Sequence, residues 1–393
     1  MISIRAVRPG DVNAIAKLVK GAGFPVRSAE GWHWALFENP EQGGLAPGLV
    51  AERRNTLVAM IGLQARRFHV NGRLQTAICG HTFISGPDGR GAGFALARRA
   101  LQTHGGSAIY TLNNNAIAGD FHKRIGLEAW LGPHGRERIE WPIHSMTMAA
   151  GRMMTRLARD EAIRDWLVRR EFFGGAPRTL ERALPARGKI LPLDPLRRGD
   201  GDLIEEFNMA AHMGSRAVPD RSADVYAYQM SDPDAPGRIA LLGLEGKDGL
   251  DGLIQLAITK PNSFEPAELE IIDLTVRPGI DPAIVLPPMI NAAKTVARNA
   301  RLSRLKLPFS NRFEDVCYSG TGLRFVRKSQ HDPAHTAFGP DCTGLQTDWS
   351  PSGFEGDLFF ALRIPPAPSR TREHPAPKEP FHRAAWDHKT SET

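Results

Sequence analysis

The sequence has few cysteines, no long apolar run and no metal-binding signature. Its three cysteines, Cys79, Cys317 and Cys342, are odd in number and widely spaced. This argues against a disulfide framework and against a cysteine zinc site. No apolar run approaches the roughly 20 residues that span a bilayer. Residues 1–5 resemble a strand more than a signal peptide, so we expect a cytoplasmic protein.

Composition sets the class of protein but not its activity. The chain has 393 residues, 41% hydrophobic and 24% charged, which is normal for a globular protein. It is too long for one ordinary core, so we expect two domains. The net charge of +7 suits an anionic partner. Nucleic acid, a membrane surface and a phosphorylated cofactor all meet that description, so charge alone does not choose among them.

The chain divides into four regions. We predict a domain of mixed strands and helices over 1–145, a helical linker over 146–188, a second mixed domain over 189–364 and a disordered Pro-rich tail over 365–393. In the linker, helical spacing extends from residue 153 to 173. The apolar positions that we expect to be packed there are Met153, Leu157, Trp166 and Leu167.

Local signals in the first region predict how it begins. Residues 2–7 alternate between apolar and polar, as a half-buried strand does. Asp11 can then cap a helix. Further along, Asn71-Gly72 between two strand-like runs is the strongest short hairpin signal. The second of those runs continues as a long strand to Ser85.

A glycine-rich turn follows that strand. Residues 86–93 read Gly-Pro-Asp-Gly-Arg-Gly-Ala-Gly, and a helix begins near Phe94. Such a turn points backbone N–H groups at the positive end of a helix dipole, where a phosphate or pyrophosphate binds. The dinucleotide pattern G-x-G-x-x-G/A fails at Phe94 and at Leu96, and the P-loop pattern fails because no Lys-Ser/Thr follows. Without further evidence, the turn is equally consistent with an ordinary strand-to-helix connection.

A second motif gives the turn a context. Residues 115–127 follow the pattern Asn115-x-x-Ala118-x-x-Phe121-His122-x-x-x-Gly126-Leu127, after a strand at 109–112. Together with Gly91-Ala92-Gly93, this resembles the GNAT family of acyl-CoA-dependent acyltransferases over residues 1–145. The family pattern is R/Q-x-x-G-x-G/A, then an Asn and a helix of form N-x-x-A-x-x-hydrophobic-Y-x-x-x-G-F. Asp88 stands where the family has Arg or Gln.

The resemblance implies an α/β fold, a site and a chemistry. The acyl-CoA-binding residues would be Phe83, Ile84, Gly89, Arg90, Gly91, Ala92, Gly93, Phe94 and Asn115. The strand at Thr82 to Ile84 would orient the thioester through main-chain groups. His122 stands where the family has the Tyr that protonates the thiolate, and imidazole can do this work. His81 and Glu52 are candidate bases, although a lone strand His or Glu is more often structural.

The second region repeats part of the first. Asn311, Tyr318 and Gly322 have the spacing of Asn115, His122 and Gly126, and both regions have Arg-x-Gly-Asp before an amphipathic helix. The glycine turn is not repeated, because its counterpart contains Pro278, Asp281 and Pro282. We therefore predict a tandem pair of GNAT-like domains, each a twisted, mostly antiparallel sheet flanked by helices, with a degenerate second copy.

These features predict an N-acyltransferase that uses acetyl-CoA, or another acyl-CoA, to acylate a primary amine by direct attack. We expect a small-molecule acceptor near the junction of the halves and no metal. We do not expect nucleic acid or a membrane as partner. The sequence is compatible with a homodimer. The alternative is a catalytically inactive GNAT-derived binding or scaffold protein, which Asp88 and His122 favour. Nucleic-acid binding, the third reading, rests on charge alone.

Overall fold

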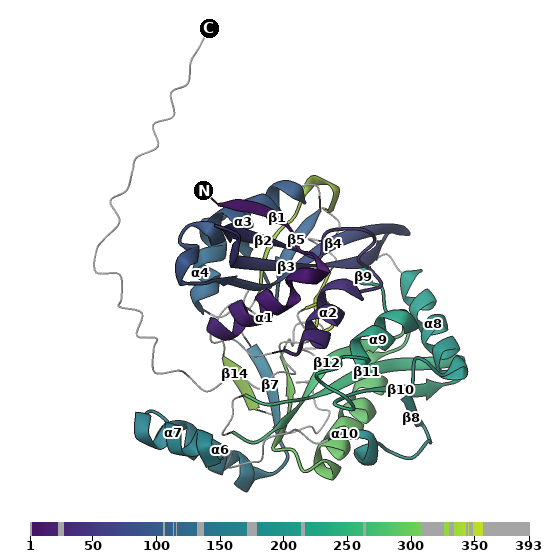
Figure 1. The fold of residues 1–393 in the computed structure, drawn as a ribbon. Coiled ribbons are helices and arrows are strands. Elements are labelled where there is room, and N and C mark those ends of the chain that lie inside the picture. The colour runs from purple at the N-terminus through teal and green to yellow at the C-terminus, as the bar shows by residue number, and fades with distance from the viewer. Residues whose placement is uncertain are drawn as a thin grey trace.

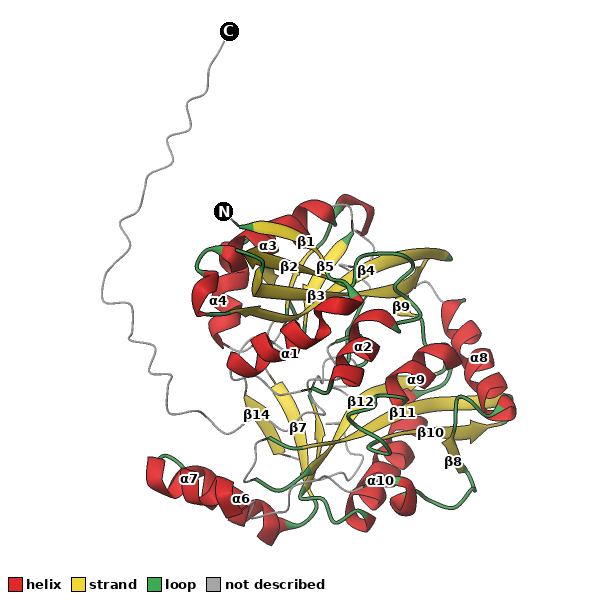
Figure 2. Cartoon of the chain, in the orientation of Figure 1, coloured by secondary structure: helices red, strands yellow, loops and turns green. Residues whose placement is uncertain are grey.

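The structure is a computed structural model. It describes residues 2–22, 27–104, 107–112, 114, 116–131, 137–170, 179–213, 217–261, 265–308, 326–329, 334–342, 345 and 349–356. Asn115, the second-copy residues Asn311, Tyr318 and Gly322, and the tail 365–393 lie outside these residues. Two sheets flanked by helices make up the molecule, one above the other in Figure 1 and in the secondary-structure colours of Figure 2. The mixed α/β class predicted from the sequence is confirmed.

The first sheet has the strand order β1-β2-β3-β4-β5-β15-β6, with β9 paired to β3. Its strands are β1 (Ser3–Ala6), β2 (Gly48–Arg53), β3 (Thr56–Val70), β4 (Arg73–Ser85), β5 (Ala108–Thr111), β6 (Glu128–Ala129), β9 (Val218–Pro219) and β15 (His335–Ala337). The helices are α1 (Val12–Gly21), α2 (Ala29–Phe37), α3 (Ala92–Thr103) and α4 (Ala116–Arg124). Because neighbouring strand residues face opposite ways, α1 and α2 pack on Met60 and Ile84, while α3 packs on Ala59 and Leu63.

The second sheet has the order β14-β7-β13-β12-β11-β10-β8. Its strands are β7 (Glu137–Pro142), β8 (Ile190–Leu193), β10 (Ile239–Gly246), β11 (Gly249–Thr259), β12 (Glu268–Val276), β13 (Arg304–Leu307) and β14 (Val326–Ser329). Helix α10 (Pro282–Asn299) covers one face, and α8 (Arg198–His212) and α9 (Ala223–Met230) cover the other. Short 3-10 turns are η1 (Pro9–Asp11), η2 (Pro87–Gly89), η3 (Glu181–Ala183) and η4 (Pro340–Cys342).

Each sheet contains strand material from the other half of the chain: β7 joins the second sheet, and β15, with the short β9 paired to β3, joins the first. β7 follows β6 in the sequence but lies between β13 and β14, where Trp141 pairs with Leu305. β15 comes from the second half but lies between β5 and β6, where His335 pairs with Thr111 and with Ala129. The exchange is reciprocal, so neither 1–145 nor 189–364 contains a whole sheet. Those bounds stay a prediction.

The linker forms two helices where a single one over 153–173 was predicted. They are α6 (Ser145–Leu157) and α7 (Glu161–Arg170), which project from the body in Figure 1. The break follows from Asp160, whose side chain accepts a hydrogen bond from the Ile163 N–H (3.0 Å) and so caps α7. Leu167 is buried as expected, but Met153, Leu157 and Trp166 are exposed, so their predicted packing was wrong. Among the described helices, none has the length and apolar character to cross a membrane.

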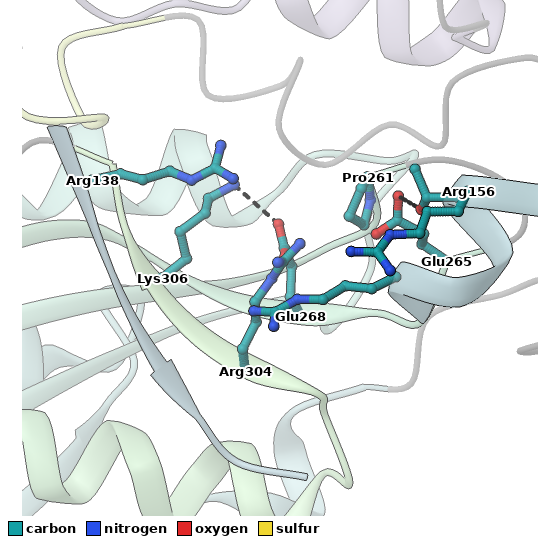
Figure 3. Close-up of a pocket in the computed structure, with 9 residues that line it drawn as sticks. Arg138, Arg156, Pro261, Glu265, Glu268, Arg304 and Lys306 are labelled. Carbon is teal, nitrogen blue, oxygen red and sulfur yellow. Dashed lines mark hydrogen bonds and ion pairs between the residues drawn. The ribbon is translucent and has the colours of Figure 1, made fainter. Parts of the chain in front are cut away.

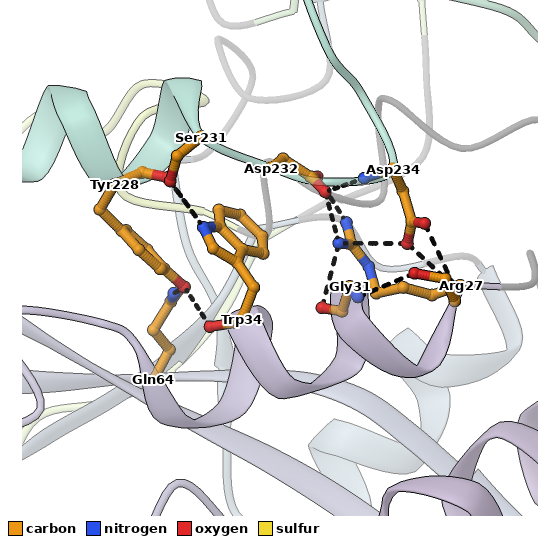
Figure 4. Close-up of polar contacts among 9 residues, drawn as sticks. Arg27, Gly31, Trp34, Gln64, Tyr228, Ser231, Asp232 and Asp234 are labelled. Carbon is orange, nitrogen blue, oxygen red and sulfur yellow. Dashed lines mark hydrogen bonds and ion pairs between the residues drawn. The ribbon is translucent and has the colours of Figure 1, made fainter.

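A buried ion pair joins the two halves where α2 meets the end of α9. Both guanidinium Nη atoms of Arg27 donate to Asp232, each at 2.7 Å, and neither side chain is exposed. Beside them, the Trp34 ring stacks on Tyr228 with centroids 4.5 Å apart, and Gln64 donates to the Tyr228 hydroxyl (Figure 4). A buried bidentate pair fixes both distance and angle between the surfaces that carry it.

Removing one partner of this pair should destabilise the whole protein. In Asp232→Asn, Arg27 stays buried without its bidentate countercharge, so we expect the free energy of unfolding to fall by about 3–5 kcal/mol. Denaturant unfolding measures the loss. Glu206→Gln is the control, because Glu206 and Arg277 form a partly exposed pair at 3.2 Å that should contribute at most ~1 kcal/mol. Equal small losses in both variants would contradict the structural role given to Arg27.

Candidate active site

The candidate site begins where two parallel strands separate. β4 and β5 pair only from Ala77 with Ala108 to Cys79 with Tyr110. β4 then continues to Ser85, while β5 ends at Thr111. From Gly80 onward, β4 keeps β3 as a neighbour, but no described strand lies along its other edge. That edge presents main-chain donors and acceptors to a ligand, as an unpaired strand edge does.

A bulge lies on the open part of β4. Gly62 pairs with His81 and Met60 pairs with Ile84. Between these two pairs β4 advances by three residues while β3 advances by two, so β4 carries one extra residue. Thr82, inside the bulge, has φ of +47°, which is rare for a β-branched residue. Such backbone conformations cost about 1–3 kcal/mol each and cluster at functional sites. The bulge lies within the stretch Thr82 to Ile84, which the family resemblance implies would orient the thioester.

The glycine turn connects β4 to α3 and is held by its own main chain. The Gly86 N–H donates to the Val58 carbonyl (2.8 Å), and the Ser85 hydroxyl donates to the Gly89 carbonyl (2.9 Å). A Cβ at Gly89 would lie 2.5 Å from that same Val58 oxygen, so this position requires glycine. Gly91 has φ of +80° and is the N-cap of α3. Glycine adopts this left-handed conformation readily.

The N-terminus of α3 has no side-chain cap. The first N–H groups of a helix have no carbonyl partner within it, and they carry the positive end of the dipole. Ala92 and Gly93 are buried there, whereas Asp88, Arg90 and Phe94 are exposed. The Arg90 carbonyl accepts a hydrogen bond from the Arg53 guanidinium (3.3 Å). Gly91, directly before Ala92, is exposed, so an anion such as a pyrophosphate would meet the main chain of the turn at this residue.

Two aromatic rings lie between the bulge and α4. Phe83 and Phe121 stack with centroids 4.9 Å apart and planes 26° apart. A Cβ at Gly93 would lie 3.1 Å from the Phe83 ring, which places this ring against the start of α3. Ile84 points to the opposite face and packs in the core with α1 and α2. Of these two predicted residues, only Phe83 presents its side chain on the α3 face.

His122 lies in α4 beside a histidine from the second half. The ring centroids of His122 and His335 are 5.5 Å apart, and both residues are buried. Burial and, to a smaller extent, the neighbouring His335 lower the pKa of His122 to about 4. Nδ1 of His122 has no hydrogen-bond partner among the described residues. His122 is therefore neutral at pH 7.

His335 was not predicted from the sequence. Its Nδ1 lies 3.0 Å from the side-chain nitrogen of Asn114, which also donates to the Thr111 hydroxyl (2.5 Å). Asn114 and Thr111 follow β5 directly, whereas His335 arrives on the exchanged strand β15. No motif surrounds His335 in the sequence, and it is more than 200 positions away from Asn114 and His122, which lie beside it in space. Only the strand pairing identifies it.

The two candidate bases lie far apart. His81 is buried on β4, with Nδ1 3.1 Å from the Thr82 hydroxyl oxygen. Glu52 accepts hydrogen bonds from Arg5, the shorter at 2.6 Å. Their partners on β3, Gly62 and Leu57, are five residues apart, which is roughly 16 Å along a strand. His81 thus lies at the bulge, and Glu52 lies towards the glycine turn, so they do not form one constellation.

The second sheet repeats the strand separation without the cradle. β12 and β13 are parallel only at Leu269 with Leu305 and Glu270 with Lys306. β12 has its own register shift, opposite Gln255 and Leu256. At the start of α10, however, the Asp281 carboxylate accepts from the Ala283 N–H (2.9 Å). An anion there would have to displace this carboxylate, and Pro282 offers no N–H.

Comparison with known proteins gives the fold. No protein-family model and no curated protein matches the sequence. The structure is similar to Saccharomyces cerevisiae N-myristoyltransferase with bound myristoyl-CoA and inhibitors (TM-score 0.52, 12% identity, covering 90% of this chain and 86% of that one). It is also similar to a probable N-acyltransferase of Enterococcus faecalis (0.51, 12%, 89% and 75%). A GCN5-related N-acetyltransferase from Anabaena variabilis gives 0.50, 10%, 86% and 73%.

The chain therefore has the fold of the GNAT superfamily. More particularly, it has the tandem form, in which two GNAT-like sheets occur in one chain. This confirms the fold that the motifs at Gly91–Gly93 and at Phe121–Gly126 predicted. Among the described residues, no group of three or more His, Cys, Asp or Glu side chains is arranged to hold a metal ion.

The buried state of His122 can be tested by acid unfolding. The unfolded chain takes up a proton at the ordinary pKa of 6.5, whereas folded His122 does so only at about 4. Stability from this residue is therefore full above pH 6.5 and is lost as the pH falls towards 4, by up to ~1.4 kcal/mol per pH unit. Unfolding curves between pH 4 and 7 should show a smaller pH slope in His122→Asn than in wild type. His33→Asn, which removes an exposed imidazole, is the control. An unchanged slope in His122→Asn would show that its ring is not buried as described.

Proposed function

We propose that this protein is an acyl-CoA-dependent N-acyltransferase with one active site, in the first sheet. The observation that carries the proposal is the bulged, open edge of β4, which leads to helix α3, whose N-cap residue Gly91 gives it no side-chain cap. Three solved structures of similar fold are described as acyltransferases, or as probable ones, which agrees with the proposal. The donor would be acetyl-CoA or another acyl-CoA, and the acceptor a small primary amine.

The residues of this chain would divide the work of binding and orientation. The exposed N-cap residue Gly91 and the uncapped N-terminus of α3 would hold the pyrophosphate. The open edge of β4 near Phe83 would pair with the amides of the pantetheine arm as an added strand does. When bound, the cofactor supplies an activated acyl thioester. Holding it beside the amine makes the attack effectively unimolecular.

Proton movement is the second requirement. The amine nitrogen gives up a proton as it forms the new amide bond, and the departing sulfur must gain one. With its pKa at about 4, His122 would act at pH 7 as a neutral imidazole. It could not arrive already protonated, so it would donate a hydrogen bond that stabilises the departing thiolate. The thiolate would then take its proton from solvent. His81, at the bulge, remains the proposed route for the amine proton. Glu52, already bound to Arg5, is the weaker candidate.

The alternative is a binding protein without catalysis. Two observations favour it: Glu52 is held in an ion pair, and Asp88 places a carboxylate at the exposed surface of the turn. A binding protein of this kind would keep the cradle for CoA and lack turnover. Binding and turnover must therefore be measured separately.

The cradle is tested by a pair of glycine substitutions. Gly91 and Gly72 both have positive φ, and a Cβ at either would meet no atom within 4 Å. Valine at each site should therefore impose a similar backbone strain, on the order of 1–2 kcal/mol. Titration calorimetry with acetyl-CoA should show affinity at least ~10-fold weaker in Gly91→Val, since the strain moves the anion donors. Gly72→Val, in the β3–β4 hairpin, should bind like wild type. Absence of binding by the wild-type protein would end the acyl-CoA proposal.

Turnover is tested by thiol release. Acetyl-CoA, with myristoyl-CoA as a longer donor, would be incubated with a panel of primary amines, and free thiol measured. We expect acceptor-dependent release by wild type, and a loss of about 10²-fold or more in His122→Ala with CoA binding retained. Binding without release for any amine would favour the non-catalytic alternative. Equal turnover in wild type and His122→Ala would remove His122 from the mechanism.

A further inference from the structure

A second candidate site lies on the other sheet, under helix α6. A cavity of about 420 Å³ opens there between α6 and the strands β7, β12 and β13 (Figure 3). It is lined by Arg138, Arg152, Thr155, Arg156, Pro261, Glu265, Glu268, Arg304 and Lys306. Its size falls within the range of small-molecule sites, roughly 300–1,000 Å³. β7 reaches this sheet only through the strand exchange, so both halves of the chain build the cavity.

Strand alternation explains why charged side chains line this wall. Leu269 and Leu305 face α10 and its core. Their neighbours Glu268, Arg304 and Lys306 therefore face the opposite side of the sheet, towards α6. The charged row is part of the inner wall and not of the outer surface: Arg304 and Lys306 have side chains only 14% and 18% exposed.

The charges on the strands balance one another. Glu268 accepts hydrogen bonds from Arg304 and from Lys306, and Lys306 also pairs with Glu270 (2.6 Å). Arg138 pairs with Glu140 at 3.0 Å. The two cations beside Glu268 lower its pKa although burial opposes them, and the pKa of Lys306 is raised by the same pairing. The pairing thus favours the charged forms of Glu268 and Lys306. Along the strands, the carboxylates Glu140, Glu268 and Glu270 face the cations Arg138, Arg304 and Lys306.

Helix α6 adds positive charge that the strands do not balance. Arg152 and Arg156 are four residues apart, on the side of α6 that lines the cavity. No carboxylate within the described residues lies at ion-pair distance from either of them, and Arg152 donates only to the Met148 sulfur (3.6 Å). Glu265, the remaining acid of the lining, accepts from Thr155 (2.7 Å). Like charges one helical turn apart repel, and an anion between them would relieve this.

We propose that this cavity binds a small organic anion that carries a phosphate or carboxylate group. Two guanidinium groups on one wall match these groups, because each can donate two parallel hydrogen bonds to their oxygens. Lys306 and Arg138 lie across the cavity from Arg156 in Figure 3. The inference does not rest on the proposed acyltransferase activity, since the glycine turn belongs to the other sheet.

The test is equilibrium binding of inorganic phosphate and of citrate to the full-length protein. Phosphorus NMR line broadening reports phosphate, and titration calorimetry reports both. We expect wild type to bind at least one probe. Replacing both cavity arginines, Arg152→Gln with Arg156→Gln, should weaken that binding by about 10-fold or more, since each removes a charged hydrogen-bonding group. Which probe binds more tightly distinguishes a phosphate ligand from a carboxylate ligand.

The control removes the same charge from other positions of the segment that contains α6 and α7. Arg159 and Arg169 are exposed and do not line the cavity, so Arg159→Gln with Arg169→Gln should bind both probes within about 2-fold of wild type. The two double variants should unfold at similar temperatures, because all four arginine residues are exposed. The proposal is overturned if wild type binds neither probe, or if both double variants lose binding equally. The second result would indicate general attraction by the net charge.

Discussion

The candidate active site depends on how briefly two parallel strands stay together. β4 and β5 share three residue pairs and then separate, because β5 ends at Thr111 while β4 continues to Ser85. The separation leaves β4 beyond Gly80 with no described strand along one edge, and a protein normally covers such an edge. The bulge at Thr82 and the turn at Gly91 both lie on this extension. Without it, the turn would be an ordinary strand-to-helix connection.

The second sheet shows which part of this arrangement is specific. It too has a parallel pair that separates, a register shift and a helix after the longer strand. Yet Asp281 caps α10 with its own carboxylate, while α3 begins at Gly91 with no side-chain cap. The N-terminus of α3 is therefore left without a side-chain cap, whereas that of α10 is capped from within the chain. The charged cavity under α6 is built from strand faces instead, so two related sheets provide unlike sites.

Features that depend on neighbouring residues were predictable from the sequence. The Asn71-Gly72 hairpin has the positive φ angles its turn requires, and the glycine turn lies where its pattern put it. Features that join distant segments were not. His335 reaches His122 through strand pairing, which leaves no mark in the sequence around it. Helical spacing also misled at Trp166, because periodicity shows which side chains share a face and not whether another element covers that face.

The strand exchange also shapes how the chain is made. Synthesis proceeds from the N-terminus, so β5 and β6 leave the ribosome long before β15, the strand that lies between them. Until His335 emerges, β5 and β6 each have an edge without a partner strand. β7 has also been made by then, but its partners β13 and β14 have not. An open edge of this kind accepts any matching strand, including β15 from a second chain. Two copies synthesised close together thus have a ready route to a domain-swapped dimer, with each donating its last strand to the other.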